Sequence, residues 1–459
     1  MALVSSYRIV ISASPTVNER RAANMLRNAI RLITGKLIPI VADTARRAAK
    51  EIVVGRTRRE PKGFLPERTR DGLWEYVIKS EEERVFICGL GLPPEPPDHF
   101  SSYRFVDEGD IGTTMGVYRF IEDVLRDQFV FEGCAELIED PALEMPARLD
   151  VEYTKKSLKV DTLPHFSETA MYMLPVTERL DWNIMTFIFR TRAGKLVVID
   201  GGHTQETENL LHALAELTPE GEVPTVDAWL LSHLHGDHYE AFLNIVSHYD
   251  SYRDRVRIKN FYCNLCEEEF YTKLSTEAAP FRANIRSALL GCGEKTGCTV
   301  HTVQTGDVID VDELSFRVLH VPDMAYAAQM NMNDSSVVYK LTVDGEQTIL
   351  FLGDAEKTCN NDLLENHLDD LKSDIVQVGH HGCGNVSKEC YAAIGAKLYL
   401  WQAGNKFWYS DKGLGPGTHD TGVITTRNRI CSLGATPERI LLDRHGPLSF
   451  ALPIDLTKY

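Results

Sequence analysis

The stretch "LLSHLHGDHYEAF" (230–242) places His233, His235, Asp237 and His238 within six positions, directly after a run of apolar residues. Imidazole nitrogens and carboxylate oxygens are ligands of zinc and other transition metals. A single histidine near the end of a strand is usually a structural or surface residue. Four ligand-type residues packed this closely behind a buried strand instead indicate a metal site.

The spacing within this stretch indicates two neighbouring positions for metal. The alternation His233-x-His235 would put both rings on one side of the chain. Gly236 would let the backbone turn, so that Asp237 and His238 face a second point close to the first. We therefore expect two metals a few ångströms apart.

Two later apolar segments also end in residues that could bind a metal. Asp354 ends "TILFLGD", and the pair His380-His381 follows "DIVQVG". Carboxylates and imidazoles are costly to bury unless they are ligated or paired. These three residues are therefore further candidate ligands.

Taken together, these motifs resemble the metallo-β-lactamase fold. The matching pieces are "LVVIDGG" with Asp200, "SHLHGDH", "FLGD" and "VGHHG". The forms "NDSSVVYKL" (333–341), "ILFLGDAE" and "VQVGHHG" are most similar to the branch that contains the nuclease domain of bacterial DNA-uptake proteins and the phosphorylcholine esterases. The resemblance covers roughly residues 165–450. It implies an αββα sandwich with the metal site at one edge of two sheets, and hydrolysis by a metal-bound hydroxide.

The resemblance also implies a role for each matching residue. One or two ions are expected, usually zinc and sometimes manganese or iron. The implied ligands are His233 and His235 for the first metal, Asp237, His238 and His381 for the second, and Asp354 as the bridge. Asp200 would orient the metal-binding loop from behind the ligands. Asp237 and His380 are the expected catalytic residues: Asp237 would orient the attacking water, and His380 would contact the substrate. The order of His380 and His381 could be reversed.

The sequence departs from the family pattern at the first metal position. The third histidine of many members is missing from "NMNDSSVV", where Asn331, Asn333 and Asp334 stand. His320 in "VLHVPD" is an alternative ligand. The sequence leaves open whether His320 or the pair Asn333 and Asp334 completes this position. In addition, "DWNIM" replaces the Gly-rich signature of the DNA-uptake branch, which weakens a nuclease assignment.

Two other features have alternative interpretations. The segment 401–422, with Trp401, Trp408 and His419, is either a loop over the mouth of the site or a packed surface loop. Cys263-x-x-Cys266, with Cys292 and Cys298, is either a structural zinc site or a set of core cysteines. The spacing of the later pair favours core cysteines.

The elements that must position these residues form a second domain, expected over residues 165–459, after a linker at 151–164. There, "NIMTFIFRTRAGKLVVIDGG" (183–202) predicts a hairpin that turns at Ala193-Gly194. "ETENLLHALAEL" has helical periodicity, and "TVDAWLLSH" predicts the buried strand that leads into the histidine cluster.

Residues 1–150 predict a smaller α/β accessory domain. Short strands at 7–12, 51–55, 74–80 and 84–89 accompany a helix that ends at Gly35 and a second helix at 115–129. The pieces "ITGKLIPIVAD", "EIVVGRT" and "GTTMGVYRFIEDVL" resemble the non-catalytic α/β domain of family 20 and family 67 glycoside hydrolases. The resemblance implies carbohydrate-related ancestry and a structural role.

Composition narrows the choice of partners and compartment. The chain has 459 residues and a formal charge of −17, which argues against an extended nucleic-acid partner because phosphate backbones are held by clustered Lys and Arg. We find no segment that predicts a secretory signal or a membrane span. We therefore expect a cytoplasmic protein with a small anionic substrate and mostly reduced cysteines.

The sequence thus predicts a metal-dependent hydrolase that acts on a small phosphodiester or related ester. Alternatives are a carbohydrate-linked ester or amide hydrolase, a non-catalytic metal-binding or assembly protein, and redox chemistry at an iron pair. The substrate, the identity and number of the metals, and the oligomeric state are not given by the sequence.

Overall fold

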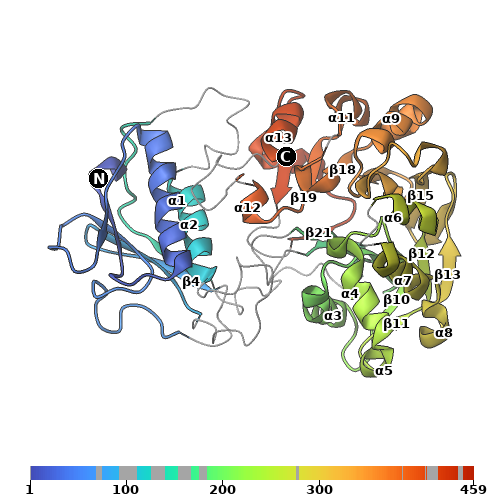
Figure 1. Ribbon diagram of the computed structural model, residues 1–459, viewed down its shortest axis with the longest axis horizontal. Helices are drawn as coiled ribbons and strands as arrows, with labels where there is room; N and C mark the ends of the chain where they lie inside the picture. The colour runs from blue at the N-terminus through green and yellow to red at the C-terminus, as the bar shows by residue number, and fades with distance from the viewer. Residues whose placement is uncertain are drawn as a thin grey trace. The chain divides into compact units, whose positions relative to one another are not determined.

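The computed structural model in Figure 1 describes residues 2–68, 75–91, 111–125, 140–153, 167–174, 183–274, 279–384, 386–408, 410, 422–442 and 448–459. The chain divides into two compact units. Unit 1 comprises Met1–Lys159, Glu178–Asp181 and Asn405–Ile424, and unit 2 comprises Val160–Thr177, Trp182–Gly404 and Thr425–Tyr459. A single linker at residues 151–164 stays a prediction, and both units contain segments that are distant in sequence.

Unit 1 contains a six-stranded mixed sheet in the order β2-β1-β3-β5-β4-β6. Strands β2, β1, β3 and β5 run parallel, whereas β4 is antiparallel to both of its neighbours. The strands are β1 (Arg8–Ile11), β2 (Ile40–Ala42), β3 (Glu51–Val54), β4 (Tyr76–Glu81), β5 (Arg84–Gly89) and β6 (Asp150–Tyr153).

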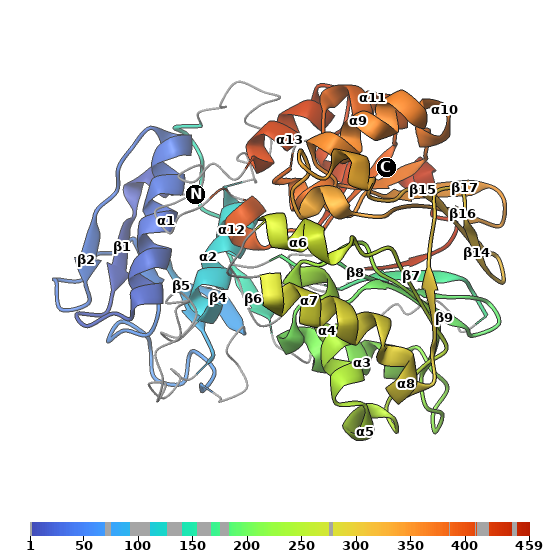
Figure 2. The same ribbon diagram turned by 45° about the vertical axis from the view of Figure 1, so that its right-hand side comes forward.

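The helices of unit 1 are α1 (Val17–Thr34), α2 (Ile111–Val124) and the short α12 (Asn405–Trp408). Helix α1 begins with a capping box, in which Thr16 and Glu19 each accept a hydrogen bond from the other's backbone amide. It ends at Gly35, whose φ of 70° is left-handed, as the sequence predicts. Helix α2 begins earlier than expected, and residues 126–129 of that expected helix lie outside the described residues. Figures 1 and 2 show α1 and α2 side by side.

Unit 2 contains two sheets. The first has the order β13-β12-β10-β9-β8-β7-β21, with β11 beside β10, and the second has the order β14-β15-β16-β17-β18-β19-β20. The first sheet consists of β7 (Ala170–Met173), β8 (Thr186–Arg190), β9 (Leu196–Asp200), β10 (Thr225–Leu230), β11 (Arg257–Ile258), β12 (Asn260–Cys263), β13 (Thr299–Thr302) and β21 (Leu448–Ala451). The second consists of β14 (Val308–Val311), β15 (Leu314–His320), β16 (Val338–Val343), β17 (Gln347–Phe351), β18 (Ile375–Gln377), β19 (Leu398–Trp401) and β20 (Ile440–Leu442).

Successive residues of strand β9 face opposite layers of unit 2. Val197 and Ile199 lie in the core between the two sheets, together with Phe351 of β17. Leu196 and Val198 face the other way and pack in the core under the helices. Because both faces of the strand are covered, all five of its residues are buried, and the sequence is apolar up to the final Asp200.

Helices cover both outer faces of the sandwich (Figure 2). On the first sheet they are α3 (Thr207–Glu216), α4 (Gly236–Ser247), α5 (Tyr249–Tyr252), α6 (Glu268–Leu274), α7 (Ala279–Leu290) and α8 (Cys292–Thr296). On the second they are α9 (Lys357–Asn366), α10 (Leu368–Leu371), α11 (Lys388–Ile394) and α13 (Val423–Cys431). The predicted αββα sandwich is confirmed, as is the hairpin β8–β9, in which Gly194 turns with a φ of 84°. Within the described ranges, no helix has the length and apolar character needed to cross a bilayer.

Candidate metal centre

The ends of four strands bring the candidate residues to one edge of the sandwich. Asp200 ends β9, and the segment from His233 follows β10, its parallel neighbour in the first sheet. Asp354 follows β17, and His381 follows β18, a parallel pair in the second sheet. Because parallel strands end at the same edge of a sheet, each sheet contributes two chain segments to one site.

The dense histidine motif spans the junction between a loop and a helix. His235 is the N-cap of α4, which begins at Gly236, so Asp237 and His238 occupy its first turn. The backbone changes from extended to helical at Gly236, as expected, but this residue has no left-handed φ, so the change of direction does not depend on glycine. A Cβ at this position would lie 2.5 Å from the Oε1 atom of Glu240, the end of a flexible side chain that would have to shift.

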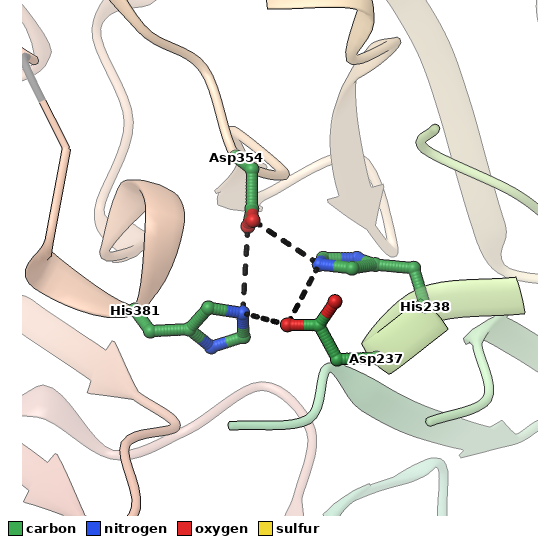
Figure 3. A group of neighbouring side chains, drawn as sticks. All are labelled: Asp237, His238, Asp354 and His381. Atoms are coloured by element: carbon green, nitrogen blue, oxygen red, sulfur yellow. Dashed lines mark ion pairs between the residues drawn. The ribbon is translucent and has the colours of Figure 1, made fainter. Parts of the chain in front are cut away.

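One group of donor atoms consists of Asp237, His238, Asp354 and His381 (Figure 3). The Nε2 atom of His238 lies 3.3 Å from Oδ2 of Asp354 and 3.8 Å from Oδ2 of Asp237. The Nε2 atom of His381 lies 3.2 Å from Oδ2 of Asp237 and 3.6 Å from Oδ1 of Asp354. Ligands about 2.0–2.1 Å from a tetrahedral zinc are roughly 3.3 Å apart, so the spacing of these four residues suits such an ion.

A second group consists of His233, His235 and the same Asp354. The Nε2 atom of His233 lies 3.8 Å from Oδ2 of Asp354, whose carboxylate therefore reaches both groups. This second group has one residue fewer than the first. The structure thus brings together all six residues that the sequence suggests as ligands.

The histidine rings present one nitrogen to the site and are anchored by the other. The Nδ1 atom of His238 bonds the Asp200 carboxylate at 2.8 Å, and that of His381 bonds the carbonyl oxygen of Gln402 at 2.9 Å. The Nδ1 atom of His233 lies 3.1 Å from the hydroxyl of Ser232 and 3.3 Å from that of Ser336.

The atoms that face inward have no hydrogen-bond partner. They are the Nε2 atoms of His233, His238 and His381, and Oδ1 of Asp354. Leaving such buried groups unsatisfied is costly, whereas a metal ion would use every one of them. Metal-bound histidines typically donate from their other nitrogen in this way, so the residues present fit a divalent metal.

Asp200 is fully buried and holds the loop that carries the histidines. Its carboxylate accepts hydrogen bonds from the backbone amide of Ser232 (2.7 Å), the hydroxyl of Ser232 (2.8 Å) and Nδ1 of His238 (2.8 Å). Its own carbonyl oxygen accepts from the indole of Trp229 at 2.6 Å, and its φ of 58° is left-handed. Asp200 therefore lies behind the ligands, where the sequence predicts it.

Burial and neighbouring charges shift the pKa values of these residues. Burial, and then the charge of His238, lower the pKa of His233 well below its ordinary value, which favours the neutral ring that a metal needs. For His238, burial alone would lower the pKa, but the carboxylates of Asp354, Asp237 and Asp200 raise it well above the ordinary value. A proton on His238 therefore competes with a metal.

His380 and His381 have different surroundings, although both adopt left-handed backbone conformations (φ of 48° and 51°). The side chain of His381 is 2% exposed and belongs to the four-residue group. The side chain of His380 is 22% exposed, and its Nε2 lies 3.8 Å from Oδ2 of Asp354. The geometry thus favours His381 as the ligand and leaves His380 beside the site.

The alternative ligands for the first metal position have other partners. The Nδ1 atom of His320 lies 2.6 Å from Oδ2 of Asp362 on α9, and His320 is in neither donor group. Asp334 accepts hydrogen bonds from the amides of Thr358 and Cys359 in the first turn of α9. Asn333 donates to Glu356 at 3.0 Å. His320 and Asp334 therefore belong to neither donor group, and Asn333 as a ligand of the first position stays a prediction.

Trp401 is a core residue and does not cover the mouth of the site. It ends β19, and its indole nitrogen donates to the carbonyl oxygen of His381 at 2.7 Å. His419 lies outside the described residues. The four cysteines considered as a zinc site are buried, and neither donor group among the described residues contains a cysteine, which favours the core interpretation. In this set, Sγ of Cys292 lies 3.6 Å from Sγ of Cys298.

Sequence reasoning missed the residues that anchor the rings. Ser232 and Glu356 stand inside quoted motifs, so their position was a signal, but neither was given a role. Ser336 also stands inside a quoted motif, "NDSSVVYKL", and was likewise given no role, whereas Gln402 acts on a histidine 21 positions earlier and no local pattern marks it.

Comparison with known proteins agrees with this architecture. Residues 196–384 match the family described as Beta-lactamase superfamily domain, a range that includes every residue of both donor groups. ComE operon protein 3 of Bacillus subtilis (strain 168) is 31% identical over 124 residues, which are 26% of this chain and 15% of that protein. The match therefore spans a small part of that relative.

Two solved structures are also similar to this chain. The metallo-β-lactamase fold protein YhfI from Bacillus subtilis is 11% identical, with a TM-score of 0.37, covering 62% of this chain and all (100%) of that one. Zn(2+)-bound PqqB from Methylobacterium extorquens is 10% identical, with a TM-score of 0.36, covering 58% of this chain and 87% of that one. The family match begins at residue 196 and does not include residues 1–150. The resemblance of that region to glycoside hydrolase accessory domains therefore stays a prediction.

Proposed function

We propose that unit 2, which has the αββα fold of the metallo-β-lactamase superfamily, is a metal-dependent hydrolase of a small phosphodiester or related ester. The observation that carries the proposal is the pair of donor groups that share Asp354 at one edge of the sandwich. Imidazole nitrogens and carboxylate oxygens, without thiolates, suit zinc and also manganese or iron. We propose zinc, in one or both positions.

The ligand assignments follow from the two donor groups. The proposed ligands are His233 and His235 for the first position, Asp237, His238 and His381 for the second, and Asp354 for both. When bound, a divalent metal lowers the pKa of a coordinated water towards about 7 and polarises an ester or phosphoryl oxygen.

Two residues of the chain are placed to act on water and substrate. The Asp237 side chain is 22% exposed, and the contacts to His238 and His381 use only its Oδ2, so Oδ1 can accept a hydrogen bond from an attacking water. His380, equally exposed at 22%, can contact the substrate through Nε2, which accepts a hydrogen bond when the neutral ring carries its proton on Nδ1 and donates one when the ring is protonated. Asp200 keeps His238 oriented throughout.

We further propose that the substrate is small and anionic. Metal ions and imidazoles attract negative charge locally, whereas the formal charge of −17 opposes the long run of phosphate contacts that duplex nucleic acid needs. A compact phosphodiester satisfies both conditions.

Metal analysis combined with a substrate panel tests this proposal. The purified protein is assayed for bound metal and for hydrolysis of bis(p-nitrophenyl) phosphate, p-nitrophenyl phosphate and p-nitrophenyl acetate. We expect turnover of the diester, its loss after chelation and its return when zinc is restored.

Two variants make this test specific. Asp354→Asn should lower kcat/KM more than about a hundredfold, because it removes a ligand from both groups. Asp374→Asn is the matched control: among the described residues, that carboxylate accepts from Thr348 at the start of β17, the opposite end of the strand from Asp354. Hydrolysis that survives complete removal of metal would refute the proposal.

A further inference from the structure

Glu356 lies next to the donor groups and receives hydrogen bonds from three side chains. Its Oε1 lies 2.9 Å from Nδ1 of His380 and accepts from the amide of Asn333 at 3.0 Å. Its Oε2 accepts from the amide of Asn331 at 2.6 Å. Burial alone would raise the pKa of Glu356, but the hydrogen bonds from His380, Asn333 and Asn331 lower it to about 2.

These contacts leave one nitrogen of His380 directed at the site. An imidazole whose Nδ1–H donates to a carboxylate has only Nε2 left for another partner. In His380 this atom lies 3.3 Å from Nδ2 of Asn333 and 3.8 Å from Oδ2 of Asp354, the carboxylate common to both groups. The His380 side chain is also packed against the backbone of Gly384, because a Cβ added to that glycine would lie 2.8 Å from the Cβ of His380.

Glu356 is not used to stabilise helix α9, although it occupies the N-cap position. Its side chain makes no capping hydrogen bond. Asp334 serves that purpose, since its Oδ1 accepts from the amides of Thr358 and Cys359 at 2.9 and 3.1 Å. The carboxylate of Glu356 is directed at His380 instead.

We propose that Glu356 is a positioning residue that fixes the tautomer of His380, with Asn331 and Asn333 holding the carboxylate in place. His380 then presents Nε2 to the substrate, with its Nδ1 proton donated to Glu356. This inference rests on the proposed function only for its effect on turnover. It also gives Asn331 and Asn333 a role in the segment where many family members place a metal-binding histidine.

The tautomer can be measured without metal or substrate. Metal-stripped protein labelled with ¹⁵N-histidine is studied by long-range ¹H–¹⁵N correlation at alkaline pH, where the ring is neutral, and His380→Ala assigns the signal. We expect the wild-type ring to carry its proton on Nδ1. In Glu356→Gln the Nε2–H form should gain population, because the neutral amide is a weaker acceptor than the carboxylate.

Asp362→Asn is the matched control. Asp362 pairs with Nδ1 of His320 at 2.6 Å, so this variant alters a similar carboxylate–histidine pair outside both donor groups. It should change the His320 signal and leave that of His380 unchanged.

Kinetics with bis(p-nitrophenyl) phosphate then measure the consequence for turnover. Glu356→Gln should lower kcat about 10- to 100-fold, with KM changed less than about twofold and metal content unchanged. Asp362→Asn should keep the wild-type kcat.

Three results would overturn the inference: a wild-type His380 protonated on Nε2, a tautomer unaffected by Glu356→Gln, or a changed tautomer with unchanged kcat. Absence of turnover in the wild-type protein would instead count against the proposed hydrolase, and the wild-type spectrum would still decide the role of Glu356.

Discussion

Replacing Asp200 with asparagine should weaken metal binding without removing any ligand. The asparagine oxygen can still accept from the backbone amide of Ser232, and the Ser232 hydroxyl can reverse to accept from the new amide group. Nδ1–H of His238 would then face an N–H donor at 2.8 Å. The ring should therefore move its proton to Nε2, the atom that lies 3.3 Å from Oδ2 of Asp354 within the proposed metal site.

The size of this effect follows from the contacts. Losing a partner of this kind typically costs about 10- to 100-fold in metal affinity. That range corresponds to about 1.4–2.7 kcal/mol. The protein should also lose stability by about 1 kcal/mol, because a buried hydrogen bond to a charged carboxylate is replaced by a weaker one from a neutral amide to Nδ1 of His238.

Competition titration measures the affinity. Zinc is added to stripped protein in the presence of a chromophoric chelator, for the wild type, Asp200→Asn and Asp374→Asn. Asp374 also accepts from both the amide and the hydroxyl of one residue, Thr348, at the far end of β17, and it has no histidine partner among the residues that the structure describes. Wild-type affinity in Asp200→Asn, or an equal loss in Asp374→Asn, would refute the tautomer argument.

Three further predictions concern other parts of unit 2. Zinc titration of stripped protein should show two phases, because one donor group has four residues and the other three. Asp354→Ala should weaken zinc binding in both phases, because Asp354 belongs to both groups. Two equally tight sites would contradict this prediction. Gly382→Ala should lower the melting temperature far more than Gly434→Ala. Both positions have a left-handed φ, which costs an alanine about 1–2 kcal/mol. Of these two positions, a Cβ would clash at Gly382, where it would lie 2.0 Å from Cζ2 of Trp401. The hydrogen bond from His320 lowers the pKa of Asp362, so its stabilisation should be complete above the ordinary carboxyl pKa and be lost as the pH falls through the lowered value. Asp362→Asn should remove this acid-dependent part of the melting temperature, and an unchanged pH profile would argue against it.

The fold of unit 2 was predictable because the site residues follow buried strands. Strands β9 and β17 are apolar runs that end at or just before a carboxylate, Asp200 and Asp354. A charged residue at that point signals a function, and parallel neighbours bring such ends together. Local sequence thus carried both the architecture and the set of candidate ligands.

The residues that select among those candidates were not predictable in the same way. His320 also ends a strand, and its sequence context resembles that of a ligand. Only the tertiary structure places it against Asp362, 42 positions later in the chain. Similarly, whether Asp334 binds metal or caps α9 depends on where that helix starts in space. These distinctions arise from contacts between distant segments, which composition and periodicity do not encode.

The composition of unit 1 has a consequence for biosynthesis. Residues 1–159 leave the ribosome well before the segment Asn405–Ile424, which belongs to the same unit. Domains generally fold as units while the chain emerges, starting from the N-terminal one. Here nearly all of unit 2 has been translated before unit 1 receives its last segment. Unit 1 should therefore complete its folding only after most of unit 2 has been translated, and earlier ribosome-bound intermediates should hold unit 1 in an incomplete form.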